Sequence, residues 1–123
     1  NITVIISTPY MDEAMRCDRV ALIQSGKILT IDEPDNIRKG FSGTLFSVRA
    51  PKKHKLINAL RNYPETLTAH PFGDSVHVTF RYDRFDPLIY DHLRKSGLED
   101  VTIMESEAGI EDRFLELMDK YKL

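Results

Sequence analysis

Hydrophobic and polar positions in the first third of the chain predict a small group of strands and helices. Residues 2–7 are an almost continuous, β-branched apolar run, typical of a strand buried on both faces. Ser25-Gly26 is a two-residue hairpin signal, and Pro34 stands where a helix favours proline. The elements expected here are a strand over 2–7, a short helix over 10–17, strands over 19–24 and 27–31, and a short helix over 34–40.

The remaining residues predict a second group, separated from the first at Ser42-Gly43. Apolar and polar residues alternate over 75–81, which predicts a strand with His77, Thr79 and Arg81 on a solvated face. The expected elements are strands over 44–50, 66–70, 75–81 and 101–105, helices from Pro51 and over 86–96, and an amphipathic helix carrying Ile110, Phe114, Leu117, Met118 and Tyr121.

The order of these elements predicts an α+β fold. A β-α-β-β-α-β succession is typical of a ferredoxin-like domain, and a terminal helix follows it here. An amphipathic helix in this position is expected to pack on the sheet of its own domain, with Phe114 in the core. A dimer contact through Phe114 is the alternative.

Composition excludes several classes of function. The chain has 123 residues, of which 41% are hydrophobic, and its net charge of −2 provides no positive field that would attract nucleic acid. No apolar run approaches the roughly 18 residues that span a bilayer. The lone Cys17 cannot form an internal disulfide, which fits a reducing compartment. The chain begins with Asn1 rather than Met, which fits a piece of a longer protein.

Residues 2–34 resemble the last segment of an ATP-binding domain of an ABC transporter. They read Ile-Thr-Val-Ile-Ile-Ser-Thr-Pro-Tyr-Met-Asp-Glu-Ala, then Cys-Asp-Arg-Val-Ala-Leu-Ile-Gln-Ser-Gly-Lys-Ile, and end in Asp-Glu-Pro. The family has Ser-Thr-His-x-x-(Asp/Glu)-Glu-Ala at its switch loop, followed by a short helix and a hairpin. More loosely, residues 44–123 resemble the C-terminal extension of ABC-2 exporters, best in Ile-Glu-Asp-Arg-Phe-Leu-Glu-Leu at 110–117.

This resemblance implies two domains, and it implies that ATP binds elsewhere in the parent protein. Residues 1–43 would be the C-terminal edge of a P-loop ATP-binding domain, and residues 44–123 a ferredoxin-like accessory domain. ATP and Mg²⁺ would bind the parent protein, and no cofactor, metal or catalytic residue is expected in this chain. The reason is that its sequence lacks the phosphate loop, the magnesium-binding aspartate, the signature sequence and the catalytic glutamate of the family. Without the parent sheet, residues 2–7 are expected to fray, to pack on the second domain, or to pair with another copy.

Pro9 occupies the position of the family's switch histidine, which the resemblance places at the γ-phosphate. Proline has neither an imidazole nor an N–H to donate, and losing one such donor costs on the order of 10²–10³ in rate. The sequence therefore predicts impaired hydrolysis in the parent. The alternative is that another group substitutes for the histidine.

Other candidate residues have structural interpretations beside the functional ones. Asp12 and Glu13 fit the acidic first turn of a helix better than an acid–base pair, and Gly26 fits turn geometry. Cys17 has no local activator. The four histidines form no metal-binding motif, although His70 and His77 could approach each other across a hairpin. A basic run near a helix start fits a solvated helix face better than a site for an anionic partner; its residues are Lys52, Lys53, His54 and Lys55. An RNA-binding domain would carry aromatic side chains on its central strands, where this sequence has His77, Thr79 and Arg81.

Two functions remain open from the sequence. In the first, the chain belongs to the ATP-binding subunit of an exporter that couples ATP binding or hydrolysis to transport. That subunit would act at the cytoplasmic face of the membrane with transmembrane permease subunits and a second ATP-binding domain or homodimer partner, and not with nucleic acid. In the alternative, residues 44–123 are a ligand-sensing regulatory domain of an ABC transporter.

Overall fold

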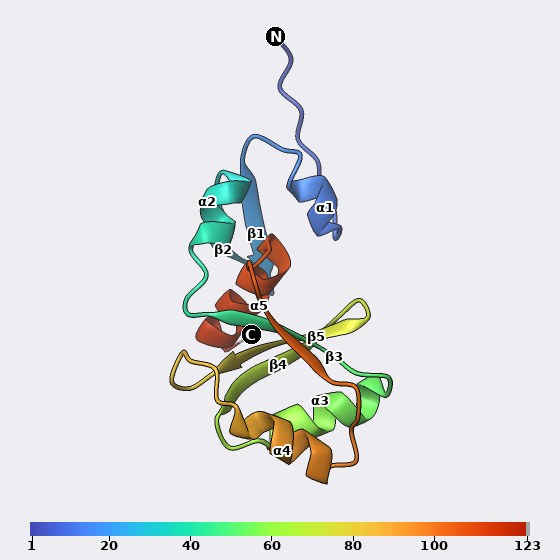
Figure 1. Ribbon diagram of the computed structural model, residues 1–123. Helices are drawn as coiled ribbons and strands as arrows, with labels where there is room; N and C mark the ends of the chain where they lie inside the picture. Colours follow the sequence, from blue (N-terminus) through green and yellow to red (C-terminus); the bar gives the residue numbers. More distant parts are fainter. Residues whose placement is uncertain (123) are drawn as a thin grey trace. The chain divides into compact units, whose positions relative to one another are not determined.

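The computed structural model describes residues 1–122 and has an α+β fold with two separate sheets (Figure 1). Contacts divide the chain into two compact units. The first unit comprises Asn1–Ser42 and the C-terminal segment from Ala108, and the second unit comprises Gly43–Glu107. The α+β class predicted from the sequence is therefore confirmed.

The first unit contains a two-stranded sheet and three helices. Its elements are α1 (Met11–Ala14), β1 (Val20–Gln24), β2 (Lys27–Asp32), α2 (Pro34–Lys39) and α5 (Ile110–Tyr121). The predicted hairpin is confirmed, because Gln24 pairs with Lys27 across Ser25 and Gly26, both at positive φ. Two successive residues in the left-handed region are the requirement of the tight hairpin turns that match strand twist.

The terminal helix differs from its expected placement. It packs within the first unit, where Ile110 and Leu117 join a buried cluster with Val20, Leu22 and Leu29. Two strands cannot enclose a core by themselves, and α5 supplies the missing apolar surface. The contacts place the segment from Ala108 in one unit with Asn1–Ser42, and Gly43–Glu107 in the other.

Residues 2–7 form no strand, which corrects the expectation from their composition. Their side chains are exposed, and Figure 1 shows this segment as an extended trace leading into α1. A strand is defined by hydrogen bonds to a neighbouring strand, so β propensity alone does not produce one. The helix predicted over 10–17 is also shorter than expected, at four residues.

The second unit is a four-stranded sheet with two helices. Its elements are β3 (Leu45–Arg49), α3 (Lys53–Asn62), β4 (Thr66–Phe72), β5 (Ser75–Phe80), α4 (Leu88–Lys95) and β6 (Thr102–Ser106). The strands lie in the order β4-β5-β3-β6, and each neighbouring pair is antiparallel. The predicted order of strands and helices is confirmed. Pro71 lies within β4, where the edge position tolerates its missing N–H.

The core of the second unit is built from the same alternation that predicted the strands. Val48, Val76 and Val78 are fully buried in one cluster with Leu56 and Leu60 of α3, and Ile89 and Leu93 of α4 belong to it as well. These side chains have the regular spacing of strand and helix faces, so the sequence specified them locally.

The polar side chains of β5 are less exposed than the sequence predicted. His77 and Thr79 were expected to be solvated, but all six residues of β5 are buried. β5 lies between β4 and β3, and residues of β4 contact side chains on its polar face. The hydroxyls of Thr68 and Thr79 are 2.6 Å apart, and the ring of Phe72 stacks on His77 with centroids 4.1 Å apart.

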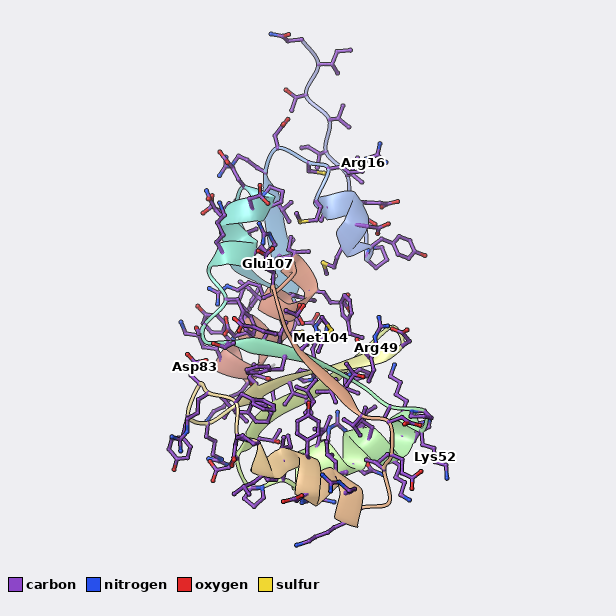
Figure 2. All side chains as sticks on the ribbon, viewed as in Figure 1. Arg16, Arg49, Lys52, Asp83, Met104 and Glu107 are labelled. Carbon is purple, nitrogen blue, oxygen red and sulfur yellow. The ribbon has the colours of Figure 1, made fainter. Side chains whose placement is uncertain are left out.

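The loop between β5 and α4 is held to the core by two carboxylates. Asp83, labelled in Figure 2, accepts a hydrogen bond from the Thr44 N–H at the start of β3. Asp86 accepts hydrogen bonds from the Leu88 N–H at 3.0 Å and from the Tyr63 hydroxyl at 2.8 Å. The Leu88 N–H, and after it the Tyr63 hydroxyl, lower the pKa of Asp86. Burial and the bond to Asp86 raise the pKa of Tyr63 to about 12.

We predict that Leu60→Ala destabilises the second unit by about 2–5 kcal/mol, because it opens a cavity among fully buried side chains. Urea unfolding followed by fluorescence measures this change. Leu67→Ala is the matched control: this leucine lies on β4 but is 60% exposed, so its removal should change the free energy of unfolding by less than about 0.5 kcal/mol. An equal decrease in the free energy of unfolding in the two variants would show that Leu60 is not a core residue.

We predict that Tyr63→Phe raises the pKa of Asp86 but leaves it below 3.8, because the Leu88 N–H still donates. The folded-state pKa of Asp86 is lowered, so its ionised form adds stability above the unfolded-state value and loses it as pH falls through the folded-state value. Carboxyl-carbon NMR titration measures the shift. An identical Asp86 titration in both proteins would show that the hydroxyl does not reach the carboxylate in solution.

Candidate functional site at the Thr8–Pro9 turn

A short network of hydrogen bonds shapes the turn that contains Pro9. The Thr8 hydroxyl accepts a hydrogen bond from the Tyr10 N–H at 3.0 Å and donates one to the Glu13 carboxylate. Thr8 is half-buried, whereas Pro9 and Glu13 are exposed. The hydroxyl therefore ties the turn to α1, which begins one residue after Tyr10.

The chemistry of this turn is limited by the residue at position 9. Proline offers no N–H and no polar side-chain atom, so this position cannot donate a hydrogen bond to an anion. The hydroxyl proton of Thr8 is directed at Glu13. Position 9 thus does not fit the γ-phosphate of ATP in the way that an imidazole would, and we derive no catalytic step through it.

Glu13 and Asp12 are both in the single turn of α1, where acidic side chains favour the positive end of the helix dipole. Glu13 accepts from Thr8, so one of its oxygens has a structural partner. Sequence reasoning placed Glu13 in the helix but missed this bond, because a threonine five residues before a glutamate is not a recognised capping pattern.

A second carboxylate, at the end of β2, shapes the entry into α2. Asp32 accepts hydrogen bonds from the Asn36 side chain at 3.1 Å and from the Glu33 N–H at 2.7 Å. The Asn36 bond, followed by the Glu33 bond and the positive charge of Arg19, lowers the pKa of Asp32. These contacts fix the entry into α2, where Pro34 occupies the first turn as predicted.

The histidines are divided between the sheet and the helices of the second unit. His70 and His77 face each other in register across β4 and β5, as the sequence suggested. His92 makes a 2.8 Å hydrogen bond to the Ala59 carbonyl and packs on Tyr63, whereas His54 is exposed on α3. Within residues 1–122, no three histidine, cysteine or acidic side chains converge as metal ligands.

The remaining candidates are engaged in local contacts. Cys17 is half-buried, and its thiol donates to the Glu13 carbonyl at 3.6 Å. Lys53 of the basic run donates to the Gly73 carbonyl, and nearby Arg49 forms a 3.2 Å ion pair with Asp74. Figure 2 labels Arg49 and Lys52 at opposite ends of the β3–α3 connection. Lys53 thus has a carbonyl partner and Arg49 a carboxylate partner.

Sequence comparison connects the chain to one class of protein. No family model matches it. It is similar to ATP-binding proteins of ABC transporters, and the similarity supports a relationship to ABC ATPases. The relatives are the probable multidrug ABC transporter ATP-binding protein YbhF of Escherichia coli (strain K12) and that of Shigella flexneri, each 26% identical over 118 residues, or 94% of this chain. The chain spans 20% of the length of these curated relatives.

In residues 1–122, none of the helices combines the length and the apolar character that crossing a membrane requires.

We predict that Thr8→Val loosens the turn, because valine keeps the β-branched shape and removes both hydrogen bonds of the hydroxyl. Amide hydrogen exchange of Tyr10 should accelerate by about fivefold, because a hydrogen bond worth roughly 1 kcal/mol is lost. Thr8→Ser, which retains the hydroxyl, is the control. Equal exchange in the wild type and in Thr8→Val would show that the Tyr10 N–H is not protected by this bond.

Proposed function

We propose that the chain is the C-terminal part of the ATP-binding subunit of an ABC transporter, and that this transporter is an exporter. The observation that carries the proposal is the extent of the match. A single relative aligns with 94% of the chain, so it aligns with residues of both units and not with one short motif. The Ser-Thr-Pro-Tyr-Met-Asp-Glu-Ala segment adds independent support from the residues themselves.

In this proposal the first unit is the C-terminal edge of the P-loop domain. The second unit is a ferredoxin-like accessory domain. Its order β4-β5-β3-β6, antiparallel throughout, supports this assignment, because it is the arrangement produced by a split β-α-β-β-α-β succession. We assign α5 to the first unit, on the evidence of its buried contacts there.

The chain's own residues would shape the turn and not supply the chemistry. Thr8 and Glu13 hold the segment around Pro9, and the hairpin packs against α2 and α5. ATP and Mg²⁺ would be bound by residues outside this chain, since the motifs that cradle phosphates and hold magnesium do not occur in its sequence. The ATP site of the parent is expected to be slow, with Pro9 in place of the histidine.

The partners proposed are transmembrane permease subunits and a second ATP-binding domain, identical or not. The location that follows is the cytoplasmic face of the membrane, reached through the transporter complex. Both statements depend on the relationship to ABC ATP-binding proteins.

The test is ATP turnover by the full-length protein that carries this chain, with Pro9 and with Pro9→His. Restoring an imidazole donor should raise kcat by up to about 10²–10³, if this donor is the one missing from the site. Tyr10→His, one residue away on an exposed side chain, is the matched control and should leave kcat unchanged. Equal turnover by the natural protein and the Pro9→His variant would reject the slow-site proposal, and turnover that is absent in both would reject the ATPase itself.

A thermal-shift series with amino acids, nucleotides and lipophilic drugs tests the ligand-sensing alternative on the chain alone. A ligand that binds only the folded state raises the midpoint of unfolding in proportion to its occupancy. We expect no saturable shift. A saturable shift with one small molecule would favour the ligand-sensing function instead.

A further inference from the structure

The connection that leads from the first unit into the second is anchored on both sides of Gly43. The Ser42 N–H donates a hydrogen bond to Glu116 of α5 at 2.9 Å, within the first unit. The Thr44 N–H donates to the carboxylate of Asp83, within the second unit. Gly43 is therefore the single residue between a backbone group that is held by the first unit and one that is held by the second.

The backbone of Gly43 has a conformation that suits glycine in particular. Its φ is +79°, in the left-handed region that side chains with a Cβ atom disfavour. A Cβ atom at this position would also lie 3.3 Å from Oδ1 of Asp83, closer than ordinary van der Waals contact. Glycine has more accessible φ/ψ states than other residues, so the chain can change direction here more easily than at its neighbours.

Both anchoring carboxylates belong to fixed parts of their own units. Glu116 forms an ion pair with Arg113, three residues before it on α5. Asp83 has φ +47°, which aspartate tolerates, and its N–H donates to the Phe80 carbonyl at the end of β5 at 3.3 Å. The conformational freedom of this connection is therefore concentrated at Gly43.

The return connection to the first unit is also short. Residues 107–108 follow β6, which ends at Ser106, and precede α5 and its cap. At that cap, the Gly109 N–H donates to the Asp112 carboxylate at 2.9 Å. Leu45 of β3 pairs with Ser106 of β6, so both connections leave the second unit from adjacent strand ends. Adjacent strands are about 4.8 Å apart, and two short connections so close together favour rotation about one axis.

We propose that Gly43 and residues 107–108 form a two-strand hinge, about which the second unit rotates as a rigid body relative to the first. Each unit keeps its own core and its own anchoring hydrogen bond during this rotation. The φ/ψ changes are absorbed by the few residues between the anchors, as in other hinge motions. The inference does not require the proposed ATPase function.

Double electron–electron resonance between spin labels on the two units tests the hinge. The labels are attached at Lys39→Cys on α2 and Leu67→Cys on β4, both exposed positions, in a Cys17→Ser background. The reference pair lies within the second unit, at Leu67→Cys and Lys95→Cys on α4. We expect a broader distance distribution between the units than within the second unit, because only the first pair reports the rotation.

Gly43→Ala should shift the most populated distance between the units, because alanine disfavours the positive φ at this position. Gly73→Ala is the matched control. Gly73 has φ +57° in the turn between β4 and β5, so the same substitution strains a turn inside the second unit and should leave the distribution between the units unchanged. Circular dichroism verifies that each variant is folded.

The anchor in the second unit is tested separately. Asp83→Ala should broaden the distribution between the units, because it releases the Thr44 N–H from the second unit. Asp83→Asn, which keeps an acceptor oxygen and tolerates the same φ, is the control and should not. The Asp83 pair decides the matter if Gly43→Ala does not fold.

A wild-type distribution between the units as narrow as that of the reference pair would overturn the proposal. So would equal distributions in the wild type and Gly43→Ala, an equal shift in Gly43→Ala and Gly73→Ala, or equal widths in Asp83→Ala and Asp83→Asn. Each of these results is independent of ATP turnover, so failure here leaves the proposed function to its own test.

Discussion

The apolar contact between the terminal helix and the β1–β2 hairpin is the constraint on which the first unit depends. Two strands and two short helices cannot enclose Val20, Leu22 and Leu29, and α5 closes this cluster with Ile110 and Leu117. Polar contacts fix the same helix: Glu116 accepts from the Ser42 N–H at 2.9 Å and pairs with Arg113. A segment more than 70 residues away in sequence therefore completes the core.

This closure makes the second unit an insertion. Residues 43–107 leave the first unit after Ser42 and return to it before Ala108, so the second unit is attached at both of its ends. Its core is nevertheless its own, because the fully buried leucines, isoleucines and valines of α3, α4 and the sheet contact one another. Two covalent connections restrict how a unit can move, compared with a unit that is attached by one linker.

The shape of the turn at Pro9 and the functional interpretation of Pro9 rest on different observations. Its bonds, Thr8 to Tyr10 and Thr8 to Glu13, explain the shape of the turn without any ligand. The functional interpretation of Pro9 comes from the neighbouring sequence and from the relationship to ABC ATP-binding proteins. The structure contributes the observation that position 9 offers no donor and that the adjacent hydroxyl is directed at Glu13.

The sequence by itself determined the elements whose signals are local: the Ser25-Gly26 turn, the helix opened by Pro34, and the alternation that buries Val76 and Val78. The tertiary structure decided what depends on neighbours distant in sequence. Residues 2–7 have strand composition but form no strand, because pairing requires a second edge. His77 has the position of a solvated residue but is buried, with the ring of Phe72 stacked on it. The amphipathic face of α5 does not reveal which sheet it covers. Periodicity specifies which face of an element is apolar, and only packing specifies what lies against that face.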